Sequence, residues 1–327
     1  PMAVVLGLSD LSAWLTEFSL LRNLGFAALF VFLTVLIISA GVEQGIEKWS
    51  SRLMPSLFVL MIALIIYVLT QDGAMEGLRH YLVPDFSQIT SPKLIVSAMG
   101  QAFFSMSLGV GTMLVYGSYI RADENLPVVG VLVTLTDTSV AFLAGLLVLP
   151  AIFVAQNLGV TIYAASGNLI AGPNLIFQVL PALFEGMGIA GLFVGFAFFV
   201  LMSIAAVTSS ISMLEVPVSY AVEAHKVNRN KATWLIGLIV FAISSAICLN
   251  FDTLFGFVIT MTTERAQPLL SMMVCIFAGW VFYRNTILQE LKSGNPNVEH
   301  GIFWKIWPVY VKFFCPALIL LTFAQGF

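Results

Sequence analysis

Two groups of oxygen-bearing residues stand inside long apolar segments of this sequence, where ions and zwitterions could be bound. In the first group, Ser105 comes shortly before Gly109 and Gly111. Glycine weakens a helix interior by about 1 kcal/mol relative to alanine, and serine hydroxyls can replace backbone partners that an unwound turn loses. Unwound backbone at membrane depth presents carbonyl groups that bind ions. We therefore predict an interrupted helix here, and a close helix–helix contact through the glycines is the alternative.

The second group lies on the apolar segment at 191–221. Ala205, Thr208 and Ser209 are three and four residues apart, so they share one face of a helix. Two hydroxyls and a nearby backbone carbonyl are hard oxygen ligands, which suit a small hard cation. The alternative is that both hydroxyls bond back to the preceding helical turn, as Ser and Thr do in membrane helices.

Carboxylates also occur within the apolar segments. Asp137 has apolar sequence on both sides, and a charge near the bilayer centre costs at least about 2.5 kcal/mol. We expect Asp137 to face the protein interior as a cation ligand, or else to be protonated or internally hydrogen-bonded. Glu215 and Glu223 are eight residues apart on one helix face. Glu223 is expected at a cytoplasmic mouth, where a solvated helix end is the alternative.

Composition limits the class of protein. Only 9% of the 327 residues are charged and 59% are hydrophobic, with a mean hydropathy of +0.99. Soluble domains contain about 25% charged residues. The apolar runs are continuous and extend over about 20 residues, which is typical of membrane-spanning helices and not of the alternating strands of a membrane barrel.

Several functions are not expected. The scattered basic residues form no stripe that would favour a nucleic-acid partner. No HExxH, GxSxG or paired catalytic Asp motif occurs, so we do not expect an enzyme. Cys248, Cys275 and Cys315 are far apart in apolar sequence; they are expected to be packed thiols and not a metal or disulfide framework.

We predict an all-α polytopic membrane protein with about eight transmembrane helices. The predicted spans are 24–41, 53–70, 94–119, 127–154, 191–221, 233–249, 254–283 and 305–324. They form a single transmembrane domain at 24–324, in which the span at 94–119 is discontinuous. Residues 1–23 are predicted to be an external loop.

The distribution of basic residues predicts the orientation. Alternate loops hold nine of them: Lys48, Arg52, Arg121, Lys226, Arg229, Lys231, Arg284, Lys292 and Lys305. The loops on the other side hold Arg79 and Lys93. Cytoplasmic loops carry the excess of Lys and Arg, so both termini of the chain are expected on the extracytoplasmic side of the plasma (bacterial inner) membrane. Because residues 1–23 do not resemble a signal peptide, we expect an odd number of further helices upstream.

Four motifs resemble the neurotransmitter:sodium symporter family in its bacterial form. They are GVEQGIE at Gly41–Glu47, MPSLF at Met54–Phe58, GQAFFSMSLGVGTMLVYGSY ending at Tyr119, and AAVTSSISMLE at Ala205–Glu215. The resemblance implies helices four to eleven of an inverted-repeat fold. It also implies that the family's first three helices, which complete the ion and substrate sites, are partners absent from this chain.

The resemblance assigns roles to the polar residues found above. Ser105 and Asp137 match ligands of a first sodium site; the family often has Asn at the position of Asp137. The carbonyl of Ala205 and the side chains of Thr208 and Ser209 match a second sodium site. The complete protein is therefore expected to bind two Na⁺ ions.

The resemblance also implies a substrate site and a gate. The matching substrate residues are Phe104 as a lid, Ser107 beside the amino group, and Val110, Ser209 and Met213 around the substrate side chain. Tyr119 and Glu223 match a cytoplasmic gate.

The implied activity is sodium-coupled symport of a neutral, hydrophobic amino acid by alternating access. Chloride is not expected to be required, because Ala141 stands where chloride-dependent members have a serine and Asp137 can supply a fixed negative charge. A transport-incompetent fragment, and a channel or receptor of another membrane fold, are the alternatives.

Overall fold

The computed structural model describes residues 19–163, 169 and 175–325, and these residues are almost entirely helical. No strand occurs among them, apart from an isolated bridge between Tyr163 and Leu169. This confirms the predicted all-α class. The first described helix begins at Leu20, and most of the predicted external loop at 1–23 lies outside the described residues.

The helices, with π- and 3₁₀-helical segments marked η, follow one another in this order: α3 (Leu20–Ser39), η1 (Val42–Glu47), α4 (Lys48–Leu69), α5 (Ala74–Leu82), η2 (Phe86–Gln88), α6 (Pro92–Ser105), α7 (Thr112–Ser118), α8 (Leu126–Asn157), η3 (Leu175–Val179), α9 (Leu180–Gly186), α10 (Gly188–His225), α11 (Arg229–Leu249), α12 (Phe251–Ile259), η4 (Thr260–Ala266), α13 (Gln267–Ile276), η5 (Phe277–Val281), α14 (Arg284–Gly294), η6 (Val298–His300), α15 (Ile302–Val309), η7 (Tyr310–Phe314) and α16 (Cys315–Gln325).

Six helical stretches among the described residues are long and apolar enough to cross a membrane. A seventh results if 253–281 and 284–294, which are bent by 99° relative to each other, count as one span. The predicted span at 94–119 is not among them, because it is divided into the short helices α6 and α7. The number of eight transmembrane helices therefore stays a prediction.

Some segments predicted as loops contain short helices. The connection after α4 forms α5, which begins behind Gly73 in a left-handed conformation (φ +90°). The long connection after α8 forms η3 and α9. These helices are too short to span a bilayer, which needs about 20 residues, so they add to the fold without adding spans.

The described chain divides into two compact units. One comprises the residues up to Pro84 and Ser139–Ile211; the other comprises Asp85–Thr138 and the residues from Ser212 onwards. Both α8 and α10 contribute residues to each unit.

The first unit has an apolar core made by α4, α9, the second half of α8 and the first half of α10. Helix α5 packs directly on α8 at Gly77. A β-carbon added there would lie 2.6 Å from Cα of Pro150 and 2.8 Å from the carbonyl oxygen of Leu149. The hydroxyl of Tyr81 donates to the carbonyl of Phe142 at 3.2 Å. Glycine at position 77 is therefore what allows α5 to lie on α8.

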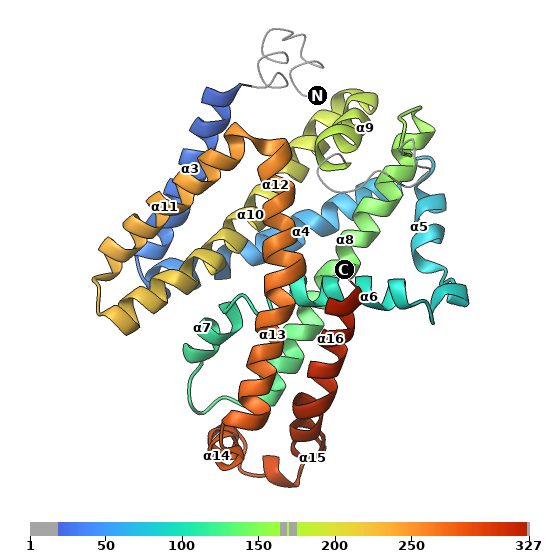
Figure 1. Ribbon diagram of the computed structural model, residues 1–327. Helices are drawn as coiled ribbons and strands as arrows, with labels where there is room; N and C mark the ends of the chain where they lie inside the picture. The colour runs from blue at the N-terminus through green and yellow to red at the C-terminus, as the bar shows by residue number, and fades with distance from the viewer. Residues whose placement is uncertain (1–18, 164–168, 170–174, 326–327) are drawn as a thin grey trace. The chain divides into compact units, whose positions relative to one another are not determined.

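In the second unit, α13 and α16 run side by side (Figure 1). The segments next to these helices, η5 and η7, are also close together. A β-carbon added at Gly279 in η5 would lie 3.0 Å from Cα of Lys312 in η7. A smaller apolar cluster joins α14 to α15 through Leu291, Val298 and Trp304. The second unit also contains α6, which carries Phe104 and Ser105, and α7, which ends directly before Tyr119.

We predict that Gly77→Ala lowers the free energy of unfolding by about 1–3 kcal/mol, because the added methyl group meets backbone atoms that cannot move aside. The matched control is Gly25→Ala in α3, where no described atom lies within 4 Å of the added carbon; it should raise stability by up to about 1 kcal/mol. Thermal unfolding in detergent, followed by thiol-reactive dye fluorescence, measures both. Equal melting temperatures for the two variants would contradict the contact.

Candidate functional site

The helix that carries the first predicted ion ligand is interrupted. Helix α6 ends at Ser105 and α7 begins at Thr112 (Figure 1). Between them Ser107, Gly109 and Gly111 have φ values of 51°, 81° and 91°. Only glycine adopts this left-handed region at no steric cost, so the two glycines let the chain leave the helix and re-enter it within six residues.

The interruption changes the hydrogen bonding of the backbone. The carbonyl of Phe103 accepts from the amide of Leu108 at 3.0 Å and from Nε2 of Gln267 at 2.8 Å. Within the part of the chain that the structure describes, no backbone amide donates to the carbonyls of Ser105, Met106, Leu108 or Gly109. Carbonyl groups in this condition can bind an ion or the ammonium group of a substrate.

Helix α13 supports the interrupted segment from one side. A β-carbon added at Gly109 would overlap the carbonyl oxygen of Gln267 and lie 2.6 Å from Oγ of Ser271. Gln267 itself is buried, with 5% of its surface exposed. The close helix contact that was the alternative explanation of the glycines thus exists at Gly109 together with the interruption. The sequence did not single out Gln267.

The structure brings Ser105 and Asp137 together. The hydroxyl of Ser105 lies 2.8 Å and 2.9 Å from the two carboxylate oxygens of Asp137, which projects from α8. Asp137 is half-buried, and none of the ion pairs among the described residues includes it. A carboxylate has about four acceptor positions, so this internal hydrogen bond leaves capacity for a cation.

The second predicted ion site lies on α10 in the first unit. The hydroxyl of Thr208 donates back to the carbonyls of Ile204 at 3.1 Å and Ala205 at 3.0 Å. This is the back-bonding that the sequence left open. It also places two predicted ligands, the hydroxyl of Thr208 and the carbonyl of Ala205, in direct contact. Because a hydroxyl keeps two acceptor lone pairs while it donates, Thr208 can still bind a cation, and Ser209 follows it on the same helix.

The residues predicted to contact a substrate are mostly apolar and exposed. Phe104, Val110 and Met213 have exposed fractions of 51%, 38% and 47%. Ser107 lies within the interrupted segment and is half-buried. Ser209 and Met213 are four residues apart on α10, so they share one helix face.

Tyr119, predicted as a gate residue, contacts Glu215. Its hydroxyl donates to Oε1 of Glu215 at 2.6 Å, and Nη2 of Arg229 lies 2.6 Å from Oε2 of the same carboxylate. Glu215 is fully buried. Glu223, the other predicted gate residue, is exposed and accepts from Ser219 at 3.3 Å.

The chain positions Arg229 with a short turn. Lys226 has a left-handed backbone (φ 55°), and the side chain of Asn228 accepts from the amide of Asn230 at 3.0 Å. This cap starts α11 at Arg229. From the sequence, Arg229 is counted only as a charge of a cytoplasmic loop. Only Glu215 could have indicated the role of Arg229, because a carboxylate in an apolar span needs a cationic partner.

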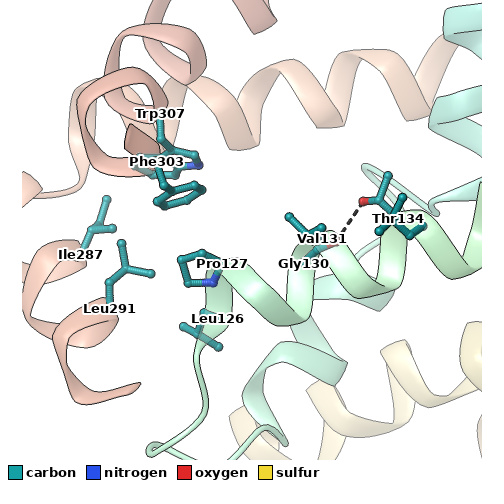
Figure 2. Close-up of a pocket in the computed structure, with 10 residues that line it drawn as sticks. Leu126, Pro127, Gly130, Val131, Thr134, Ile287, Leu291, Phe303 and Trp307 are labelled. Carbon is teal, nitrogen blue, oxygen red and sulfur yellow. Dashed lines mark hydrogen bonds between the residues drawn. The ribbon is translucent and has the colours of Figure 1, made fainter. Parts of the chain in front are cut away.

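A cavity of about 550 Å³ lies elsewhere in the second unit and does not contain these ligands. Figure 2 shows it between the first half of α8 and the residues of α14 and α15. Its walls are mainly apolar, with Leu126, Val131, Leu291 and Trp307 among them. The hydroxyl of Thr134 donates to the carbonyl of Gly130 at 2.9 Å (Figure 2). The cavity therefore offers little to an ion or a zwitterion.

The chain is similar to known proteins over most of its length. The model of the Sodium:neurotransmitter symporter family matches residues 10–327. The sodium-dependent transporter YhdH of Bacillus subtilis (strain 168) is 33% identical over 312 residues, which are 92% of this chain and 66% of that protein. A sodium-dependent transporter of Haemophilus influenzae (strain ATCC 51907 / DSM 11121 / KW20 / Rd) is 35% identical over 307 residues, or 92% and 65% of the two chains.

A solved structure is also similar. The crystal structure of MhsT in complex with L-phenylalanine superposes with a TM-score of 0.78 at 36% identity, over 93% of this chain and 68% of that one. The chain thus spans about two thirds of the length of the transporters it matches.

We predict that Glu215→Gln destabilises the protein by about 3–5 kcal/mol, because it leaves the guanidinium of Arg229 without its buried counter-charge. Glu223→Gln is the matched control on the same helix. Its carboxylate is exposed, so a change within about 0.5 kcal/mol is expected. Melting temperatures in detergent measure both variants. A Glu215→Gln protein as stable as the Glu223→Gln protein would show that the buried pair contributes nothing.

Proposed function

The chain belongs to the Sodium:neurotransmitter symporter family, and from that premise we propose that its protein is a sodium-coupled symporter of a neutral, hydrophobic amino acid. The family consists of membrane transporters and not of enzymes, in agreement with the sequence prediction.

The observation that carries the proposal is the difference between two carboxylates of the same unit. Glu215 is neutralised by Arg229. Asp137 receives the neutral hydroxyl of Ser105 and no ion pair among the described residues. An ionised carboxylate in an apolar environment is costly unless a cation pairs with it. The interrupted helix beside it would supply the neutral oxygens that a bare cation also needs.

We assign the two sodium sites different affinities for Na⁺. The first would combine the negative charge of Asp137 with the hydroxyl of Ser105, so an Na⁺ ion there forms a neutral pair. The second would combine the carbonyl of Ala205 with the hydroxyls of Thr208 and Ser209, which are all uncharged. Since uncompensated charge is penalised at low dielectric, the first site would bind Na⁺ more tightly than the second.

The substrate would be a zwitterion with an apolar side chain. Ser107 and the carbonyls of the interrupted segment would receive its ammonium group. Phe104, Val110, Ser209 and Met213 would surround its side chain, three of them through apolar atoms. MhsT, which is 36% identical, was crystallised with L-phenylalanine, and this supports an amino acid of comparable polarity.

Coupling would follow from preferential binding. Ions and substrate drive a conformational change only if they bind one state better than its alternative, and transporters of this kind alternate by movement of one bundle against another. Tyr119 and Glu223 would form the cytoplasmic gate, and the contact of Tyr119 with the pair formed by Glu215 and Arg229 would hold α7 against α10. The basic loops named above would face the cytoplasm, with both chain termini outside the plasma membrane.

Counterflow of labelled amino acid into proteoliposomes, with and without Na⁺, tests the proposed function. The complete gene product should accumulate labelled phenylalanine or leucine when Na⁺ is present, and substitution by K⁺ should abolish the uptake. Equal uptake in both ions would reject sodium coupling.

We predict that Thr208→Ala and Ser209→Ala each raise the Na⁺ concentration needed for half-maximal uptake about tenfold. The loss of one ligand is comparable to the loss of a hydrogen bond to a charged group, about 1.5–3 kcal/mol, and 1.4 kcal/mol corresponds to a factor of ten. The control is Ser203→Ala, whose hydroxyl bonds back to Phe199 in the same helix at 2.8 Å. A similar shift in the control would refute the assignment of the second site.

Chloride gives a separate prediction. Since Asp137 can supply a fixed negative charge and position 141 is alanine, uptake rates should stay unchanged when gluconate replaces all chloride at constant Na⁺. The measurement is initial uptake in proteoliposomes. Loss of uptake would mean that an anion site is needed after all.

A further inference from the structure

Two of the three cysteines of the chain meet across a helix pair. Cys275 lies on α13 and Cys315 is the first residue of α16, and these helices run side by side (Figure 1). Their side chains interact electrostatically with each other, and both residues line one cavity. Both are half-buried and neither forms a disulfide. The third cysteine, Cys248, lies on α11.

Cys275 and Cys315 both line a cavity of about 370 Å³ in the second unit. Met99 adds a third sulfur atom to its wall, and the rest is mainly apolar, including Phe103, Leu108 and Ile319. No carboxylate or imidazole belongs to this lining. Hard cations require several oxygen ligands, whereas soft thiolate and thioether ligands select soft metal ions. The chemistry of the wall therefore favours a thiophilic cation.

Charge and coordination number limit which sulfur-binding metal ions the two cysteines could hold. Zinc is almost always held by four ligands in structural sites, and the described residues contain no group of three or more His, Cys, Asp or Glu that could hold a metal. A divalent ion that prefers two sulfur ligands replaces one proton on each thiol, so that two RS–H groups and M²⁺ give RS–M–SR and two H⁺. The product is neutral, which avoids the cost of charge in an apolar cavity.

We propose that Cys275 and Cys315 form a two-coordinate binding site for a divalent thiophilic cation of the mercury(II) class. The site fastens α13 to α16 next to the interrupted helix, because Ser271, one turn before Cys275, lies against Gly109. Mercuric chloride is itself uncharged and reaches an apolar cavity without a hydrated path.

A binding experiment on the purified chain in detergent tests the site without any need for transport. The protein is loaded with mercuric chloride and desalted in the presence of excess monothiol. Bound mercury is then measured by elemental mass spectrometry. Free thiols are counted after unfolding by the mass added with maleimide. One mercury per chain and one free thiol are expected.

The three single variants form a matched set. Cys275→Ser and Cys315→Ser should each lose mercury to the competitor at a concentration about 100-fold lower than the wild type does, because the second thiol acts at an effective concentration of at least millimolar. Cys248→Ser should retain mercury like the wild type, with no free thiol left. Retention by Cys275→Ser or Cys315→Ser, or loss from Cys248→Ser, would overturn the proposal.

A second measurement covers the case in which a variant folds poorly. Mercury should raise the melting temperature of the wild type and of Cys248→Ser, because it cross-links two helices of the folded state. A dithiol should reverse the rise. An unchanged melting temperature of the wild type in stoichiometric mercury would contradict a bridge between α13 and α16.

Discussion

The proposed site depends on the hydrogen bonds made by the backbone between Ser105 and Thr112, where a helix stops inside an apolar span. Non-helical backbone at membrane depth is tolerated only where protein or a wet cavity receives its polar groups. Here the amide of Leu108 and the side chain of Gln267 both donate to the carbonyl of Phe103. The close fit of Gly109 against α13 allows this arrangement. The carbonyls of Ser105, Met106, Leu108 and Gly109 receive no backbone amide among the described residues, so they are available to a ligand.

Two carboxylates of the same unit, Glu215 and Asp137, differ in their hydrogen-bond and ion-pair partners. Glu215 has a cationic partner and a phenolic donor, both at 2.6 Å, so its charge is fixed within the protein. Asp137 has a serine hydroxyl. A fully paired carboxylate holds helices together, and an incompletely paired one attracts a mobile cation. This contrast separates a carboxylate that links helices, Glu215, from one that we propose as an ion ligand, Asp137.

Periodicity and composition could predict the helical class, most helix positions and the interruption near Gly109 and Gly111, because glycine and apolar length act locally. The pairing of Ser105 with Asp137 followed from the family resemblance rather than from spacing. Gln267 and Arg229 could not be predicted as partners, since each acts on a residue more than ten positions away and nothing in its own neighbourhood indicates this. The back-bonding of Thr208 was foreseen as an alternative. Short helices such as α5 were missed because they are too short for a hydropathy signal.

The central claim is that the interrupted segment and Asp137 bind Na⁺. Hydrogen–deuterium exchange of the segment from Met106 to Thr112 tests it most directly, in NaCl against KCl at equal ionic strength. The account predicts slower exchange of these amides in Na⁺, with no change in peptides of α11, because an ion bound to the segment's carbonyls restricts its opening. Identical exchange in the two salts would contradict it.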